Sequence, residues 1–126
     1  MRVQRFLIAA ALAGLPGFDG GRAAELVMVE QPGCSYCEAW HDQVAPEYPK
    51  TAEGRFAPLV RVQLREGAPE GVTFDRPAVF TPTFILVEDG EELARIEGYP
   101  GEDFFWGLLG RMLEDHTDFN EGGDRQ

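Results

Sequence analysis

The sequence predicts one α/β domain, a four-stranded mixed sheet with helices on both faces. Three observations predict it: a strand–helix–strand order in the first half of the chain, a tight hairpin in the second half, and an amphipathic helix after the hairpin. A right-handed crossover makes the first two strands parallel, and the hairpin then adds antiparallel strands to the same sheet. The expected order is therefore β-α-β followed by β-β-α.

The first half supplies two strands and a helix. An apolar run at 26–31 predicts a buried strand, and Pro32-Gly33 predicts a turn after it. Prolines at 46 and 49 end the helix that follows, and alternation at 58–64 predicts a half-covered strand. The helix is expected at 35–45, with large apolar residues that could face the core at every fourth position, namely Tyr36, Trp40 and Val44.

The second half supplies the hairpin and the last helix. Residues 65–79 are rich in glycine, proline and charge, which predicts a loop with at most one helical turn. The clearest strand pattern lies at 83–88, and Asp89-Gly90 strongly favours a two-residue hairpin into a returning strand at 93–97. Acidic residues then open a helix whose apolar face comprises Phe104, Phe105, Leu108, Leu109, Met112 and Leu113.

Two end segments lie outside the predicted domain, which spans 24–115. Residues 1–23 combine a short basic start, an apolar run and a final small-residue stretch, the order of a secretory signal peptide cleaved after Ala23. A buried first helix is the alternative, but the apolar run stops at Pro16-Gly17 and is too short to span a membrane. Residues 116–126 are acidic and contain glycine, which predicts a disordered tail.

The composition indicates an acidic globular protein. Hydrophobic residues make up 44% of the chain, which suits a packed core rather than a disordered chain. The formal charge is −11 at pH 7, and removal of residues 1–23 would make it about −13. Such acidity argues against nucleic acid and anionic membrane surfaces and favours a basic or neutral partner, although it serves solubility equally well.

The most informative motif is Cys34-Ser35-Tyr36-Cys37, which contains the only two cysteines of the chain. Two intervening residues allow the pair to close into a disulfide over one helical turn. Cys34 follows the predicted turn, where a strand ends and a helix begins, and a helix N-terminus lowers the pKa of a thiol. The thiolate is the form that attacks a disulfide, so the motif predicts thiol–disulfide exchange.

Three other interpretations of the cysteine pair compete. It could be a structural disulfide, although so short a loop constrains the unfolded chain weakly. It could bind a metal such as copper, with His41 one turn beyond Cys37, but three or four ligands are usual and His116 lies near the far end. It could also be a coincidence of spacing. The strand–turn–helix context favours redox chemistry over all three.

The chain resembles the thioredoxin superfamily at two separated motifs, residues 32–37 and Thr81-Pro82-Thr83-Phe84. When Trp40 and the stretches at 97–101 and 104–106 are added, the chain looks most like the SoxS-type periplasmic thioredoxins of bacterial sulfur-oxidation systems. The likeness covers nearly all of the predicted domain, and the combined motifs are more specific than the cysteine spacing alone.

The resemblance implies the thioredoxin fold and thiol–disulfide oxidoreductase activity. We also expect a monomer with no cofactor or bound metal, and the alternative is a copper-handling or protein-binding module on the same fold. It implies that Cys34 attacks the substrate and Cys37 resolves the mixed disulfide, while a cis Pro82 and Thr81 hold the substrate strand. The implied setting is the periplasm, with protein thiols or disulfides as substrates. The implied partners are a SoxYZ-like sulfur-carrier protein as target and a CcdA- or SoxV-like membrane transporter as electron donor.

Two positions depart from the ordinary thioredoxin pattern. Met28 stands six residues before Cys34, where thioredoxins carry a buried acid, so Glu30 or a water is the candidate proton relay to the second cysteine. Ser35 and Tyr36 replace the usual Gly-Pro pair, and we expect them to tune the redox potential through local hydrogen bonds. Isomerase-like or glutaredoxin-like chemistry stays open, although an acidic chain suits anionic glutathione poorly.

Overall fold

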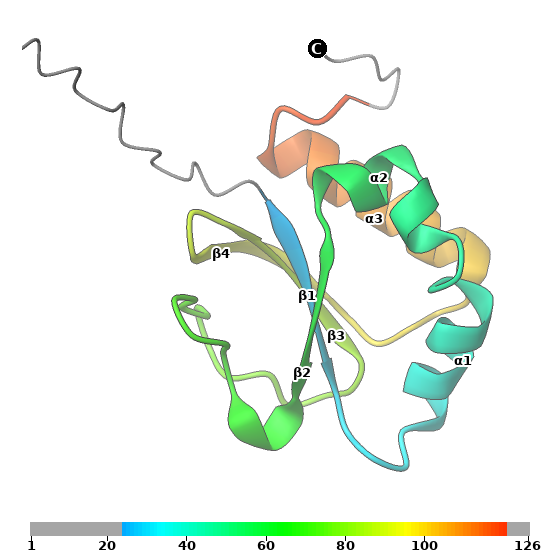
Figure 1. Cartoon of the computed structure of the whole chain (residues 1–126), viewed down its shortest axis with the longest axis vertical. Coiled ribbons are helices and arrows are strands. Elements are labelled where there is room, and N and C mark those ends of the chain that lie inside the picture. Colours follow the sequence, from blue (N-terminus) through cyan, green and yellow to red (C-terminus); the bar gives the residue numbers. More distant parts are fainter. Residues whose placement is uncertain (1–23, 121–126) are drawn as a thin grey trace, which may run out of the picture.

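The computed structural model describes residues 24–120, which fold around one four-stranded sheet (Figure 1). The strands are β1 (Glu25–Glu30), β2 (Leu59–Gln63), β3 (Thr83–Glu88) and β4 (Glu91–Glu97), in the order β2-β1-β3-β4. β1 is parallel to β2 and antiparallel to β3, which is antiparallel to β4. The predicted mixed sheet and its β-α-β, β-β-α connection are confirmed.

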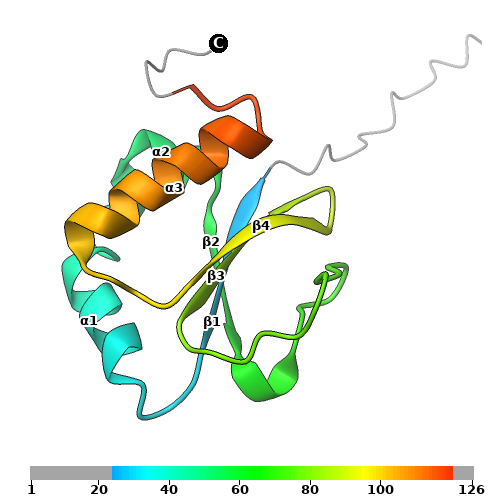
Figure 2. The ribbon, with the colours of Figure 1, turned by 180° about the vertical axis from the view of Figure 1, so that it is seen from behind.

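Three α-helices lie together on one face of this sheet, as Figures 1 and 2 show from opposite sides. They are α1 (Ser35–Gln43), α2 (Ala52–Phe56) and α3 (Glu102–His116). Two short 3₁₀ helices complete the structure, η1 (Tyr48–Lys50) before α2 and η2 (Leu64–Glu66) after β2. The sequence pattern predicts neither η1 nor α2, because a five-residue helix is too short to show a helical period.

The two faces of the sheet are covered in different ways. On the helix face, α1 and α3 pack against alternate strand residues, including Leu26, Met28, Phe84 and Leu86. On the other face, Val27, Val29, Ile85 and Val87 are covered by the loop at 64–80. The expectation of helices on both faces is therefore wrong for this second face. Within residues 24–120, η2 is the only helical segment on that face. Glycine and proline within 67–77 prevent a regular helix from forming there.

An aromatic cluster fixes α1 on the sheet. Trp40 is fully buried, and its ring centroid lies 5.2 Å from that of Phe84 and 5.7 Å from that of Phe105. The buried face of α1 runs through Cys37, Trp40 and Val44, the three-then-four spacing of one helix face. Tyr36 precedes this face by one residue and is 64% exposed, so the prediction that it faces the core is wrong.

The hairpin and the C-terminal segment follow from local sequence. Asp89 and Gly90 both have positive φ (55° and 80°), as a two-residue turn between twisted strands requires. After α3, Phe119 is buried and its ring lies 5.2 Å from that of Phe56. The folded domain therefore extends to Asn120, past the boundary expected at 115, because this aromatic contact holds the chain beyond the helix. The remaining part of the predicted tail, 121–126, and the predicted signal peptide, 1–23, lie outside the described residues.

Candidate redox site

The two cysteines lie where β1 passes into α1. Cys34 is the N-cap residue of α1, and its Sγ accepts a hydrogen bond of 3.1 Å from the backbone N–H of Cys37. The turn before it contains Gly33, whose φ of +80° suits glycine, and is closed by a hydrogen bond from the Cys34 N–H to the Gln31 carbonyl. The cysteine sulfur is thus placed at the end of a helix where unpaired N–H groups favour a negative charge.

The cysteines form a disulfide with a Cα–Cα separation of 5.2 Å, and they differ in exposure. Cys34 is half-buried, whereas Cys37 is 3% exposed within the core under α1. Ser35 and Tyr36, between them, are both exposed. Cys34 is therefore the more accessible sulfur of the pair.

The loop before β3 comes next to this turn. The Thr81–Pro82 peptide bond is cis, and the Thr81 Oγ1 accepts a hydrogen bond of 2.9 Å from the Gln31 side chain. The carbonyl of Pro82 accepts from the Gly98 N–H at 2.7 Å, which joins the end of β4 to the same place. Within residues 24–120, no hydrogen bond uses the backbone N–H or carbonyl of Thr81. Three segments far apart in the sequence therefore meet beside the cysteines.

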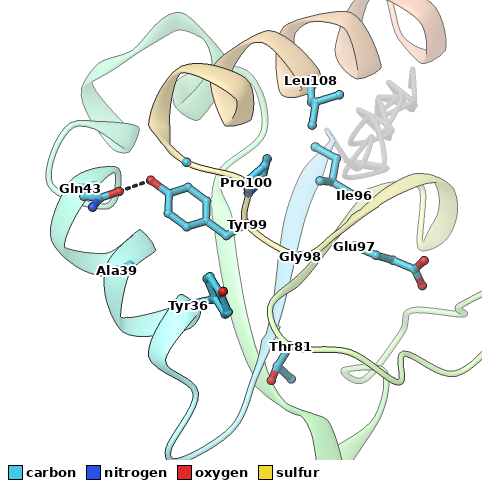
Figure 3. Close-up of a pocket in the computed structure, with 11 residues that line it drawn as sticks. Tyr36, Ala39, Gln43, Thr81, Ile96, Glu97, Gly98, Tyr99, Pro100 and Leu108 are labelled. Carbon is cyan, nitrogen blue, oxygen red and sulfur yellow. Dashed lines mark hydrogen bonds between the residues drawn. The ribbon is translucent and has the colours of Figure 1, made fainter.

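A groove of about 840 Å³ runs from this junction along α1 toward α3 (Figure 3). Thr81 lies at one end, and Leu108 of α3 lies at the other. The hydroxyl of Tyr99 donates a hydrogen bond to Gln43 Oε1, which ties the loop after β4 to the last residue of α1. The groove lining is mainly apolar and includes Tyr36, Ala39, Ile96 and Pro100.

A buried ionic cluster lies at the end of β1. Glu30 is 6% exposed, and its Oε1 lies 2.9 Å from the Nε2 of His41 on α1. Its Oε2 accepts a hydrogen bond from the Nε of Arg61 on β2. Burial alone would raise the pKa of Glu30, but the hydrogen bonds from Arg61 and His41 outweigh burial and hold that pKa below its usual range. Glu30 is therefore a charged group near neutral pH, and Met28, two residues before it on the same strand, is fully buried and apolar.

The structure gives the predicted site residues clear places and adds residues that the sequence analysis missed. Gln31, Tyr99 and Gln43 carry no sequence signal of a role at the site. The sequence predicts His41 to be a surface helix residue, with metal binding as the alternative, and here its Nε2 is directed at a carboxylate. The one signal that pointed to it was its position four residues after Cys37. In the described part of the chain, no group of three or more His, Cys, Asp or Glu side chains is placed to hold a metal ion.

Known proteins share this arrangement. The family model described as a thioredoxin-like domain matches residues 20–113, which is most of the chain. The chain belongs to the thioredoxin-like family. With its two cysteines at disulfide distance at the start of α1, this thioredoxin-like protein is a thiol–disulfide oxidoreductase, and the predicted thioredoxin fold is confirmed.

Two solved structures illustrate the likeness. The periplasmic thioredoxin SoxS from Paracoccus pantotrophus, in its reduced form, is 52% identical with a TM-score of 0.70, and the match covers 72% of this chain and 96% of that one. Fasciola hepatica thioredoxin is 22% identical with a TM-score of 0.53, over 73% of this chain and 82% of that one, and shares the fold alone. No curated protein is similar enough in sequence to count as a match. The predicted resemblance to SoxS-type thioredoxins is confirmed.

No helix within residues 24–120 is both long enough and apolar enough to cross a membrane.

Proposed function

We propose that this thioredoxin-like protein acts in the periplasm as a reductant of protein disulfides or of sulfur adducts on a carrier cysteine. The observation that carries the proposal is the position of Cys34: it caps α1, is reachable from solvent, and lies next to the Thr81–Pro82 loop. A sulfur in that position is activated by the helix N-terminus and has room for a substrate beside it.

The reaction is a two-step exchange. The Cys34 thiolate attacks one sulfur of the substrate disulfide, a bond forms between them, and the other substrate sulfur leaves as a thiolate. Cys37 then loses its proton and attacks Cys34, which releases the second substrate sulfur as a thiolate and leaves the internal disulfide. Two electrons pass from the cysteine pair to the substrate, and the substrate thiolates take up protons from water.

Substrate holding falls to the loop beside the cysteines. The free backbone groups of Thr81 can pair with an extended substrate segment, and Pro82 keeps that segment against Cys34. Ser35 and Tyr36 are exposed beside the sulfur and set its redox potential through the hydrogen bonds they offer. Glu30, which stays charged, lies between β1 and α1 and not on the side of Cys34 where the substrate would bind.

The compartment and partners are inferred from the chain ends and from the resemblance. Residues 1–23 have the pattern of a signal peptide, and the SoxS relative is a periplasmic thioredoxin. On this basis a SoxYZ-like sulfur carrier is the proposed target, and a CcdA- or SoxV-like membrane thiol transporter is the proposed electron donor. The charge of about −13 that remains without residues 1–23 suits a basic or neutral docking surface on either partner.

Insulin reduction tests the activity directly. The wild-type protein should accelerate the reduction of insulin by dithiothreitol, and Cys34→Ser should abolish the acceleration because the attacking sulfur is gone. Cys37→Ser should instead accumulate a covalent mixed disulfide, visible as an added mass, because the first step proceeds and the second does not. Activity retained in Cys34→Ser, or trapping by Cys34→Ser rather than by Cys37→Ser, would reverse the assigned roles.

A second pair of measurements tests the direction and the compartment. Equilibration of the cysteine pair in glutathione buffers should give a potential toward the reducing end of the thioredoxin range, and a potential near that of DsbA, about −120 mV, would contradict a reductant. Expression of the full chain in bacteria, followed by mass measurement of the periplasmic protein, should find a chain that begins at Ala24.

A further inference from the structure

The second step of the exchange needs a proton acceptor for Cys37. The thiol of Cys37 is 3% exposed, so water reaches it poorly, and burial in apolar surroundings raises the pKa of a thiol. A thiol with an ordinary pKa of about 8.5 is only about 3% thiolate at pH 7, and a buried one is less so. On the face of β1 that α1 covers, the buried residue Met28 is apolar and cannot accept a proton. A base close to Cys37 would therefore speed its attack.

His41 is on the same face of α1 as Cys37, one turn further along. Side chains four residues apart on a helix have Cβ atoms about 5–6 Å apart. Helical side chains also tilt toward the N-terminus, and the imidazole of His41 reaches Glu30 at the end of β1, before the turn that leads to Cys34. No direct hydrogen bond joins His41 and Cys37 within residues 24–120, but one bridging water can span that separation. His41 is partly exposed, so it can pass a proton on to solvent.

Glu30 determines which ring nitrogen of His41 is free. Its ionised carboxylate only accepts hydrogen bonds, so the hydrogen-bond network assigns the proton to the Nε2 of His41, 2.9 Å away. The Nδ1, which is closer to the helix backbone, then keeps its lone pair. Arg61 holds the other oxygen of Glu30 and so fixes the carboxylate. Imidazole is the side chain that most often acts as a general base in proteins.

We propose that the Nδ1 of His41 takes the proton of the Cys37 thiol during resolution, and that Glu30 is a positioning residue for His41. The proposal rests on the proposed exchange function and names its base. As the proton moves to Nδ1, the Cys37 sulfur bonds to Cys34 and the Cys34–substrate bond breaks, with the electron pair leaving on the substrate thiolate. The resulting imidazolium is stabilised by the Glu30 carboxylate.

The charged surroundings of His41 are few. Glu30 faces it from β1, Arg61 on β2 binds the other oxygen of that carboxylate, and the Trp40 ring on α1 makes a T-shaped contact with it, with ring centroids 5.3 Å apart. The neighbouring acids Glu38 and Asp42 on α1 are exposed, and neither forms an ion pair within residues 24–120. Within residues 24–120, Glu30 is thus the charged group that contacts the imidazole directly.

Stopped-flow reaction with dithiobis(nitrobenzoate) separates the two cysteines. The reduced protein releases one coloured thiolate when Cys34 attacks the reagent, and a second when Cys37 resolves the mixed disulfide. In His41→Asn we expect the second release to be about tenfold slower at pH 7, and the first release to stay within about twofold; an ordinary thiolate fraction of about 3% already leaves room for about a thirtyfold effect, and a buried thiol leaves more. Above pH 9 the deficit should shrink, because Cys37 then ionises without help.

Two further variants make the test specific. Glu30→Gln keeps the shape of the carboxylate without its charge and should slow the second release about threefold or more at pH 7, with the same recovery at high pH. His116→Asn, which changes the other histidine at the end of α3, should leave both releases unchanged. Thermal unfolding of each variant checks that it is folded, and Glu30→Gln decides the question if His41→Asn does not fold.

A second release that His41→Asn leaves unchanged, or slows equally at every pH, would overturn the proposal, since a merely structural histidine produces no such pH dependence. If Glu30→Gln has to decide, an unchanged second release in that variant overturns it as well. Failure of the underlying exchange function looks different: the wild-type protein would then show no rapid first release, or Cys34→Ser would not remove it.

Discussion

Gly54→Ala is a substitution whose cost can be worked out from the structure. Gly54 lies in α2, and a Cβ added to it would be 1.8 Å from the carbonyl oxygen of Tyr48 and 2.6 Å from the carbonyl carbon. Since real Cβ contacts stay at or above 3.0 Å, the two backbone segments would have to separate by about 1.2 Å. Both obstacles are backbone atoms, so no side-chain rotation relieves the clash.

The Tyr48 carbonyl cannot move without losing other contacts. It accepts hydrogen bonds from the Thr51 hydroxyl at 2.7 Å and the Thr51 N–H at 3.1 Å, and that hydroxyl accepts from the Gly54 N–H at 2.9 Å. Overpacking alone costs about 1–3 kcal/mol. Weakening one or two of these hydrogen bonds adds about 1 kcal/mol each. We therefore expect Gly54→Ala to lower the free energy of unfolding by about 2–5 kcal/mol, a large part of the stability of a small domain.

Gly107→Ala is the matched control. Gly107 is in α3 with an exposed position, and nothing lies within 4 Å of an added Cβ. Here alanine should stabilise the helix by up to about 1 kcal/mol. Thermal unfolding of oxidised protein should thus show a midpoint lowered by at least about 8 °C in Gly54→Ala and raised by up to about 8 °C in Gly107→Ala. A Gly54→Ala protein within about 0.5 kcal/mol of wild type would refute the reasoning.

Three other perturbations have defined outcomes. Tyr48→Phe removes the hydroxyl that donates to the buried carbonyl of Ala57 and should cost about 1–3 kcal/mol in urea unfolding, whereas Tyr36→Phe, at an exposed ring, should change stability by less than about 0.5 kcal/mol. The pKa of Glu30 in the folded protein lies below its ordinary 4.5, so near that pH the folded state binds fewer protons than the unfolded state. The ionised Glu30 therefore stabilises the folded state above pH 4.5, and this stabilisation is lost as the pH falls through the lowered pKa. Urea midpoints should accordingly fall less steeply between about pH 6 and about pH 3 in Glu30→Gln, and an equal slope would contradict this ion-pair account. Phe105→Ala empties a fully buried site in the aromatic cluster and should cost about 3–5 kcal/mol, so a cost near 1 kcal/mol would mean that the core collapses into the space.

The elements that the sequence predicted well are those with strong local signals. The strand at 83–88 and its Asp89-Gly90 turn match the structure residue by residue, because a two-residue hairpin needs positive φ at both positions and few residue pairs supply it. The short helix α2 was missed, since it depends on the Thr51 cap and on its contact with η1 rather than on a periodic pattern. Tyr36 was placed in the core because a four-residue spacing alone does not decide which side of a helix faces the sheet.

The cysteine pair, its place after a strand and a turn, and hence thiol–disulfide exchange were determined by the sequence alone, because these features depend on neighbouring residues. The tertiary structure decided everything that depends on distant segments. Glu30 meets Arg61 only because β1 and β2 are parallel neighbours, and it meets His41 only because α1 returns over the end of β1. The groove likewise exists only where the loop at 98–101 crosses between α1 and α3. Contacts across the sheet depend on strand order and register, and no local pattern in the sequence specifies both.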